Sequence, residues 1–317
     1  MSLLDRENEI TAVTYKYKLI FLQSSEQINI SQPLVHTARY SKKFIYSRDH
    51  PNMPSTSPFP DLPKTGISLP DTPLLREALE HLKKYTSPTI VNHCIRSAYF
   101  AILQSRKIPH NSSEPLDMEL ILFSIIMHDL GWATDKTLLS KDKRFEVDGA
   151  NMARGYLEEV KLSVGWDKHR TQLMWDTIAL HATPSFALHK EPEVMVAHLG
   201  IMTDFWGPNY SGYPITFEEN KEIVDAFPRL GFKEQFLDIM CGLCALKPET
   251  TYGTFVGDYG VEYGLDGKGT GKEEFAKERL AFSSPRVFYP AIGACEQDEE
   301  WKGCWFMFSD RNLGTCQ

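Results

Sequence analysis

The 317-residue chain lacks the features of a membrane-spanning, exported or nucleic-acid-binding protein. Its longest apolar run, over 120–127, is interrupted by one serine and is far shorter than the about 20 residues that cross a bilayer. No basic leader with an apolar centre opens the sequence. Acidic residues exceed basic ones by 42 to 34, which disfavours binding through a basic surface. We therefore expect a cytoplasmic protein whose partners include neither nucleic acid nor membrane.

Cysteine is scarce, and several common catalytic motifs are missing. Six cysteines are too few for a disulfide scaffold. Cys241 and Cys244 form the only C-x-x-C, with no second pair and no His pair at zinc-finger spacing, so we expect two small buried side chains on a helix. The sequence contains no G-x-x-x-x-G-K-[ST], G-x-G-x-x-G or G-x-S-x-G motif, and it therefore gives no support to nucleotide binding of those types or to a nucleophilic serine.

Composition divides the chain into three parts. Residues 1–68 end in a stretch crowded with Pro, Ser, Thr and Asn, which favours an extended, partly irregular arm. Residues 69–282 form the middle part, in which apolar side chains recur at helical spacing from 71 to 246 and a glycine-rich stretch with a short charged helix follows. Residues 283–317 show little periodicity and predict an irregular tail. With 42% apolar residues overall, the chain can form a core without disulfides.

The middle part predicts an all-α helical bundle. Thr72-Pro73 and Ser87-Pro88 each place a capping residue before a proline at the first helical position. Asp117 can cap the next helix in the same way. Apolar residues at helical spacing then predict further helices over 118–130, 145–160, 168–180, 191–205, 218–226, 232–246 and 272–280.

The helix predicted over 118–130 is apolar on nearly every side and ends in an adjacent imidazole and carboxylate, His128 and Asp129. Unpaired burial of polar groups costs several kcal/mol, and a divalent metal satisfies both groups in one step. His93 and Asp204 lie in two other apolar helices, where either residue alone would be a simple core hydrogen-bonding group. Four such positions on the core helices together indicate a metal site.

These residues form an H…HD…D pattern that resembles the HD-domain superfamily of helical, metal-dependent enzymes, most of which are phosphohydrolases. The surrounding segments are similar to the fungal cyanamide hydratase-like branch of that superfamily. They read LPDTPL (69–74), NH (92–93), MHDLG (127–131), RFEVDGA (144–150), IALH (178–181), EPE (191–193) and KPETTY (247–252). The resemblance covers about residues 69–282.

The resemblance implies one zinc ion held by His93, His128, Asp129 and Asp204, and a lyase reaction that hydrates cyanamide to urea. Imidazole and carboxylate ligands suit Zn²⁺, and an open coordination position lowers the pKa of bound water toward ~7. The same ligands also suit Fe²⁺, Mn²⁺ or Co²⁺. We therefore expect a zinc-dependent hydratase or hydrolase of a small nitrile-like molecule, and we leave a homo-oligomer open.

Three further side chains are candidates for catalysis. His181 ends an apolar helix and could move a proton, hold substrate or act as a fifth ligand, although the helix dipole explains a histidine there nearly as well. Glu146, in the first turn of its helix, is a candidate general acid or base. Lys136 follows the metal helix and could contact substrate. Trp132 and Trp206 could wall a small pocket, and core packing explains both almost equally well.

Other functions remain open at this point. A phosphohydrolase would need basic side chains near the metal, and the nearby ones are Arg96, Lys136 and Arg144. A metal-free binding scaffold is disfavoured because all four ligand positions are present.

A diiron oxygenase would need additional histidine ligands such as His181 and His198. His198 and Asp204 lie six residues apart, which places them about 120° away from a common helix face. We therefore expect one metal ion, while a second ion held partly by His181 and His189 stays open.

Overall fold

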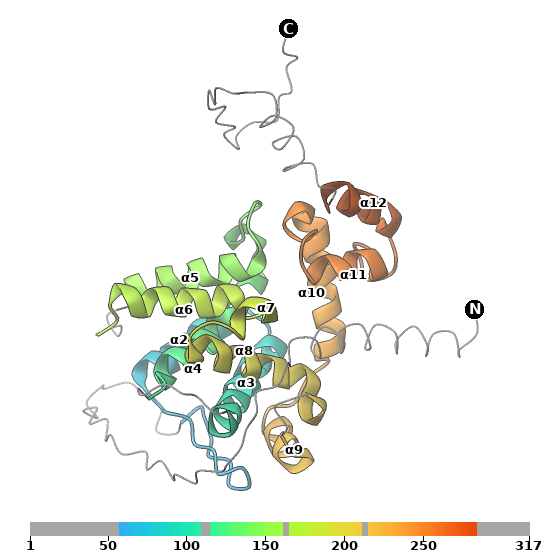
Figure 1. Ribbon diagram of the computed structural model, residues 1–317. Helices are drawn as coiled ribbons and strands as arrows, with labels where there is room; N and C mark the ends of the chain where they lie inside the picture. The colour runs from blue at the N-terminus through green and yellow to red at the C-terminus, as the bar shows by residue number, and fades with distance from the viewer. Residues whose placement is uncertain (1–56, 109–114, 161–164, 211–214, 284–317) are drawn as a thin grey trace, which may run out of the picture. The chain divides into compact units, whose positions relative to one another are not determined.

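The computed structural model describes residues 57–108, 115–160, 165–210 and 215–283 (Figure 1). The chain divides into two units, Met1–Met53 and Pro54–Gln317, and every described residue belongs to the second. Most of the predicted N-terminal arm and nearly all of the predicted C-terminal tail therefore lie outside the described residues.

Helices make up most of the described structure, which confirms the predicted all-α class (Figure 1). The one strand-like pairing within the described ranges is an isolated bridge between Leu62 and Ile67. None of the helices described is long and apolar enough to cross a membrane. The α-helices are α2 (Pro73–Tyr85), α3 (Pro88–Lys107), α4 (Met118–Met127), α5 (Phe145–Glu159), α6 (Lys168–Leu180), α7 (Pro184–Ala187), α8 (Pro192–Trp206), α9 (Phe217–Ala226), α10 (Phe232–Leu246), α11 (Val256–Tyr263) and α12 (Lys272–Ser283).

The predicted capping residues start three of these helices. The side chains of Thr72, Ser87 and Asp117 each accept a hydrogen bond from the backbone N–H three residues later. Proline occupies the first helical position of α2 and α3. Local sequence thus fixes where the helices that carry the site begin.

The structure differs from the predicted helices in two respects. Helix α4 ends at Met127, and the following residues form a 3₁₀ turn, η1 (His128–Trp132), in which Asp129 has φ −97° and ψ 17°. Helices α7 and α11 were not predicted. The first is a single turn that begins at a proline, and glycines at 257 and 260 weaken the helical pattern of the second.

Two glycines let backbones approach closely around the site. A Cβ at Gly200 of α8 would lie 2.7 Å from the carbonyl oxygen of Ser97, so α8 packs tightly on α3. A Cβ at Gly131 of η1 would lie only 2.0 Å from the carbonyl oxygen of Phe145. The first approach packs α8 on α3, and the second packs the start of α5 on the turn that carries His128 and Asp129.

The described end of the predicted arm packs on the helical domain. Phe59, Leu62 and Ile67 are buried in the same core as the helices. The Tyr99 hydroxyl of α3 donates a 2.7 Å hydrogen bond to the carbonyl oxygen of Pro60. Residues 57–68 therefore contribute to the core.

Candidate metal centre

Three of the predicted metal ligands meet in the core. His93 comes from the middle of α3, and His128 and Asp129 come from η1. One donor atom from each side chain lies within 4.8 Å of the other two. Asp129 Oδ2 is 3.1 Å from His128 Nε2 and 3.5 Å from His93 Nε2. All three side chains are buried.

Four atoms of this group lack hydrogen-bond partners: Nε2 of His93, Nε2 of His128 and both carboxylate oxygens of Asp129. Buried polar groups are almost always paired, because an unpaired one is costly. Imidazole nitrogens and carboxylate oxygens are ligands of Zn²⁺ and related divalent metals. The residues therefore fit a divalent metal, which would satisfy all of these atoms.

Hydrogen bonds on the other ring nitrogens orient both imidazoles. His128 Nδ1–H donates to the carbonyl oxygen of Ile125 at 2.7 Å, and His93 Nδ1–H donates to Asp204 Oδ2 at 2.7 Å. A proton on Nδ1 leaves Nε2 of a neutral imidazole free to bind a metal. These hydrogen bonds thus orient both rings with Nε2 near Asp129 Oδ2.

Asp204, the fourth predicted ligand, lies beside His93 and outside the three-residue group. Arg96 donates to both of its carboxylate oxygens at 2.7 Å, and His93 donates to one of them. All three side chains are fully buried. In this position Asp204 orients the His93 ring, and its role as a direct ligand stays a prediction.

Burial and nearby charges set the ionisation of the centre. Burial alone raises the pKa of Asp129, but the adjacent His128 outweighs burial and lowers that pKa below its ordinary value. For Asp204, the hydrogen bonds from His93 and Arg96 likewise outweigh burial and lower the pKa. Burial lowers the pKa of His93. Burial lowers the pKa of His128, but the Asp129 charge outweighs burial and raises that pKa well above its ordinary value. Near neutral pH, in the absence of a metal, both carboxylates are therefore ionised, His93 is neutral and His128 is protonated beside Asp129.

His181 lies next to the centre. Its ring centroid is 4.7 Å from that of His128, and its Nδ1–H donates to the carbonyl oxygen of Ile178 at 2.7 Å. Burial and the neighbouring His128 lower the pKa of His181 to about 3, so the ring is neutral. His198 Nδ1–H in turn donates to the carbonyl oxygen of His181 at 2.6 Å.

The described residues offer one group that could hold a metal, and it includes none of His181, His189 and His198. His198 is buried with an unpaired Nε2, whereas His189 is exposed. The arrangement favours one metal ion over two.

Glu146 is a buried carboxyl group at the start of α5, 2% exposed. Burial raises the pKa of Glu146 to about 7, although Arg144 and Lys247 oppose the effect. A carboxyl group with this pKa can both give and take a proton near neutral pH. The Asp129 charge also raises the Glu146 pKa, by less than burial does.

Lys136, the third catalytic candidate, begins the 3₁₀ turn η2 (Lys136–Leu138) and donates to the carbonyl oxygen of Ala133 at 2.9 Å. Partial burial and the charge of Lys247 lower the pKa of Lys136. Lys247 itself is buried, and its Nζ lies 2.5 Å from Asp148 Oδ2.

Sequence reasoning missed the roles of Arg96 and Lys247 as buried ion-pair partners. Arg96 lies three residues after His93, on the same side of α3, and this spacing was the available signal. Lys247 opens the KPETTY segment, but nothing in that segment names Asp148 as its partner.

Aromatic side chains surround the metal group. The His93 ring stacks on Phe232 with centroids 4.7 Å apart and meets Phe205 edge-on at 5.2 Å. Trp132 is buried near the group, whereas Trp206 is 48% exposed. Of the two tryptophans predicted to wall a pocket, Trp132 lies against a metal-site residue, with its ring stacked 6.4 Å from that of His93.

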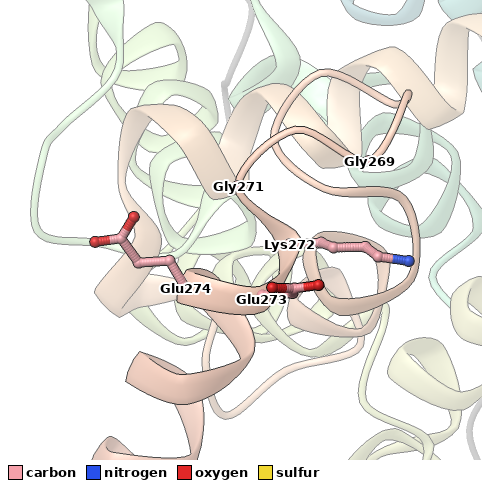
Figure 2. A pocket seen from close by; sticks show the side chains of 5 residues that line it. All are labelled: Gly269, Gly271, Lys272, Glu273 and Glu274. Carbon is pink, nitrogen blue, oxygen red and sulfur yellow. The ribbon is translucent and has the colours of Figure 1, made fainter.

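Two other parts of the chain carry no metal chemistry in this arrangement. Cys241 and Cys244 are buried, unbridged side chains of α10, as predicted. A surface hollow at the start of α12 contains none of the predicted site residues (Figure 2). It is lined by Gly269, Gly271, Lys272, Glu273 and Glu274.

The described structure is a helical core around a buried His-His-Asp group that could hold a metal ion. Residues 90–199 match the family model of the HD domain, and this part of the chain is an HD domain. The matched segment contains His93, His128, Asp129 and His181. No curated protein matches the chain.

Proposed function

We propose that the protein is a metal-dependent hydratase of a small nitrile-like molecule, with cyanamide as the favoured substrate and urea as the product. The observation that carries the proposal is the buried group of His93, His128 and Asp129, with four donor atoms that lack partners. A divalent metal bound there, for which Zn²⁺ is preferred, supplies activation of water near neutral pH. The choice of cyanamide and zinc rests on the similarity of segments such as MHDLG and RFEVDGA to cyanamide hydratases.

The protein's own residues supply proton transfer. Hydration forms a bond between water oxygen and the nitrile carbon, and the two protons of water move in turn from oxygen to the nitrile nitrogen, so that both C–N π bonds are replaced by the C=O bond of urea. Glu146 can carry these protons, because its pKa of about 7 allows it to be either base or acid. The neutral His181 imidazole beside His128 is a second group that can hold or donate a proton.

The alternative is an HD-type phosphohydrolase, which would need cationic groups free to bind phosphate. Arg96 is occupied by Asp204 through two hydrogen bonds and is fully buried. Lys136 and Arg144 donate to backbone carbonyl oxygens and keep their charges available. The commitment of Arg96 to Asp204 favours the hydratase. A diiron oxygenase is less favoured, because His181 lies outside the metal group.

Elemental analysis of the purified protein, followed by two activity assays, tests the proposal. We expect about one zinc per chain, urea from cyanamide and no release of phosphate from phosphate esters. Two irons per chain would favour the oxygenase, and phosphate release without urea would favour the phosphohydrolase. His189→Ala is a matched control for ligand substitutions, because His189 is exposed and outside the metal group.

The cytoplasmic location, the small-molecule substrate without nucleic-acid or membrane partners, and a homo-oligomeric state stay predictions from the sequence. Light scattering coupled to gel filtration tests the oligomeric state of the full chain.

A further inference from the structure

Trp132 carries a buried hydrogen-bond donor that has no partner. The residue is 4% exposed, and its indole Nε1–H has no acceptor within hydrogen-bond distance. An indole N–H can only donate, so the protein leaves this group unsatisfied. An unpaired buried polar group in a native structure points to a missing partner.

This donor belongs to the same short turn as two of the proposed ligands. Trp132 ends η1, four residues after His128 and three after Asp129. Its ring lies 6.4 Å from the ring of His93, with the two planes 20° apart. The indole ring that carries the donor therefore lies against a residue of the proposed centre.

The other close ring neighbours of Trp132 are hydrocarbon. Phe145 and Phe236 lie 5.3 Å and 5.6 Å from it, centroid to centroid, and neither offers a nitrogen or oxygen acceptor in its side chain. Among the described residues, neither these rings nor any other group accepts a hydrogen bond from Trp132.

Two cationic donors of the region are committed to buried ion pairs, because Arg96 binds Asp204 and Lys247 binds Asp148. Lys136 and Arg144 donate to backbone carbonyl oxygens. A neutral donor among aromatic rings suits a small uncharged acceptor better than a phosphate, which prefers cationic partners.

We propose that the Trp132 indole N–H donates a hydrogen bond to the substrate and selects a small, uncharged molecule with an acceptor nitrogen. The inference rests on the proposed function and deepens it. In a nitrile, negative charge builds on nitrogen as water adds to carbon, so a fixed donor there binds the transition state more strongly than the substrate. Trp132 is thus a specificity-determining residue of the proposed reaction.

Azide is the probe for this donor, because it is a linear triatomic anion with an acceptor nitrogen at each end. The full chain is loaded with Zn²⁺, its tryptophan indoles are labelled with ¹⁵N, and azide is titrated while the indole signals are followed by NMR. Trp132→Phe keeps an aromatic ring and identifies the Trp132 signal. Trp166→Phe is the matched control, because Trp166 Nε1 is also buried and unpaired but packs against Phe123 and Arg170.

We expect azide to move the Trp132 indole proton signal, and Trp132→Phe to weaken azide binding about tenfold, as for the loss of one hydrogen bond to a charged group. Trp166→Phe binds azide like the wild type, and thermal melting checks that both variants fold. If the Trp132 indole signal does not move when azide is saturating, the inference is wrong. An N–H···π contact between Trp132 and Phe236 would give that result. Equal affinity in Trp132→Phe, or no azide binding at all, also overturns the inference.

Cyanamide turnover separates this inference from the proposed function. If the wild type makes urea and Trp132→Phe keeps the same kcat/KM, the indole donor is wrong and the hydratase stands. If azide moves the Trp132 signal but no urea forms, the donor stands and the proposed substrate is wrong.

Discussion

The proposed metal centre and the glycine-rich hollow before α12 are built in opposite ways. In the centre, His93, His128 and Asp129 are buried and keep four donor atoms without partners. In the loop beside the hollow, Asp266 accepts hydrogen bonds from the backbone of Lys268 and from both the backbone and the hydroxyl of Thr270.

The charged side chains around the hollow are also exposed to water (Figure 2). Polar side chains that hydrogen-bond to their own loop or to water need no ligand. A buried cluster of polar side chains without hydrogen-bond partners does need one. A closed cluster of four unpaired donor atoms, rather than open surface, therefore distinguishes the proposed metal centre from the hollow.

The largest expected effect comes from removing a ligand of the centre. We expect His128→Ala to lose its bound metal, measured by elemental analysis, and to lower urea formation by at least about a thousandfold, since the metal supplies several kcal/mol of transition-state stabilisation. We expect Lys272→Ala, in the hollow, to keep the bound metal and the wild-type rate of urea formation. Stoichiometric zinc in purified His128→Ala would show that the ligands are assigned incorrectly.

The second effect concerns the ion pair behind the centre. Arg96→Met removes the two hydrogen bonds that Arg96 donates to the buried Asp204 carboxylate and leaves only the partly exposed Arg229 as a cation, 3.5 Å away. We expect the free energy of unfolding in urea to fall by about 3 kcal/mol. Lys221→Met, which breaks an exposed pair with Asp225, costs less than about 1 kcal/mol. A comparably small loss in Arg96→Met would mean that the buried pair contributes no more than a surface pair.

The third effect is a pH dependence that belongs to the centre alone. Burial raises the pKa of Glu146 from 4.5 to about 7 in the folded state. Its contribution to stability is therefore full below pH 4.5 and is lost as pH rises through about 7. Between pH 4.5 and 8 we expect metal-free wild type to lose about 3 kcal/mol relative to Glu146→Gln in urea unfolding.

The control for this measurement is Glu273→Gln in the hollow, where the carboxylate is exposed. We expect its stability to follow the wild type at every pH. A difference between wild type and Glu146→Gln that does not change with pH would show that the Glu146 pKa is not raised.

Local patterns predicted most of the fold. Helix starts and helix faces depend on residues that are close together in the sequence. The caps Thr72, Ser87 and Asp117 and the spacing of apolar residues therefore identify these helices. The 3₁₀ turn at His128 was missed because the same apolar pattern fits a continued helix. Helix α11 was missed because Gly260 is needed for contact with Phe275, where a Cβ would lie 2.5 Å from the ring.

For the site, the sequence predicted the residue types but not their partners. The HD pair and His93 stand out because polar residues in apolar helices are unusual. The ion pairs Arg96–Asp204 and Lys247–Asp148 join residues 108 and 99 positions apart, and no local pattern carries that pairing. The unpaired state of the Trp132 N–H likewise depends on every neighbour in the folded protein.

The smallest expected effect lies in the helix beneath the glycine-rich loop. Cys241 is buried on α10 and close enough to Gly267 for its thiol to bond the loop backbone. We expect Cys241→Ser to cost about 1 kcal/mol in urea unfolding, because the hydroxyl is more polar than the thiol it replaces. We expect zinc content and urea formation to stay at wild-type levels, because Cys241 is not part of the metal group. Loss of zinc in Cys241→Ser would show that the glycine-rich region and the metal centre depend on each other.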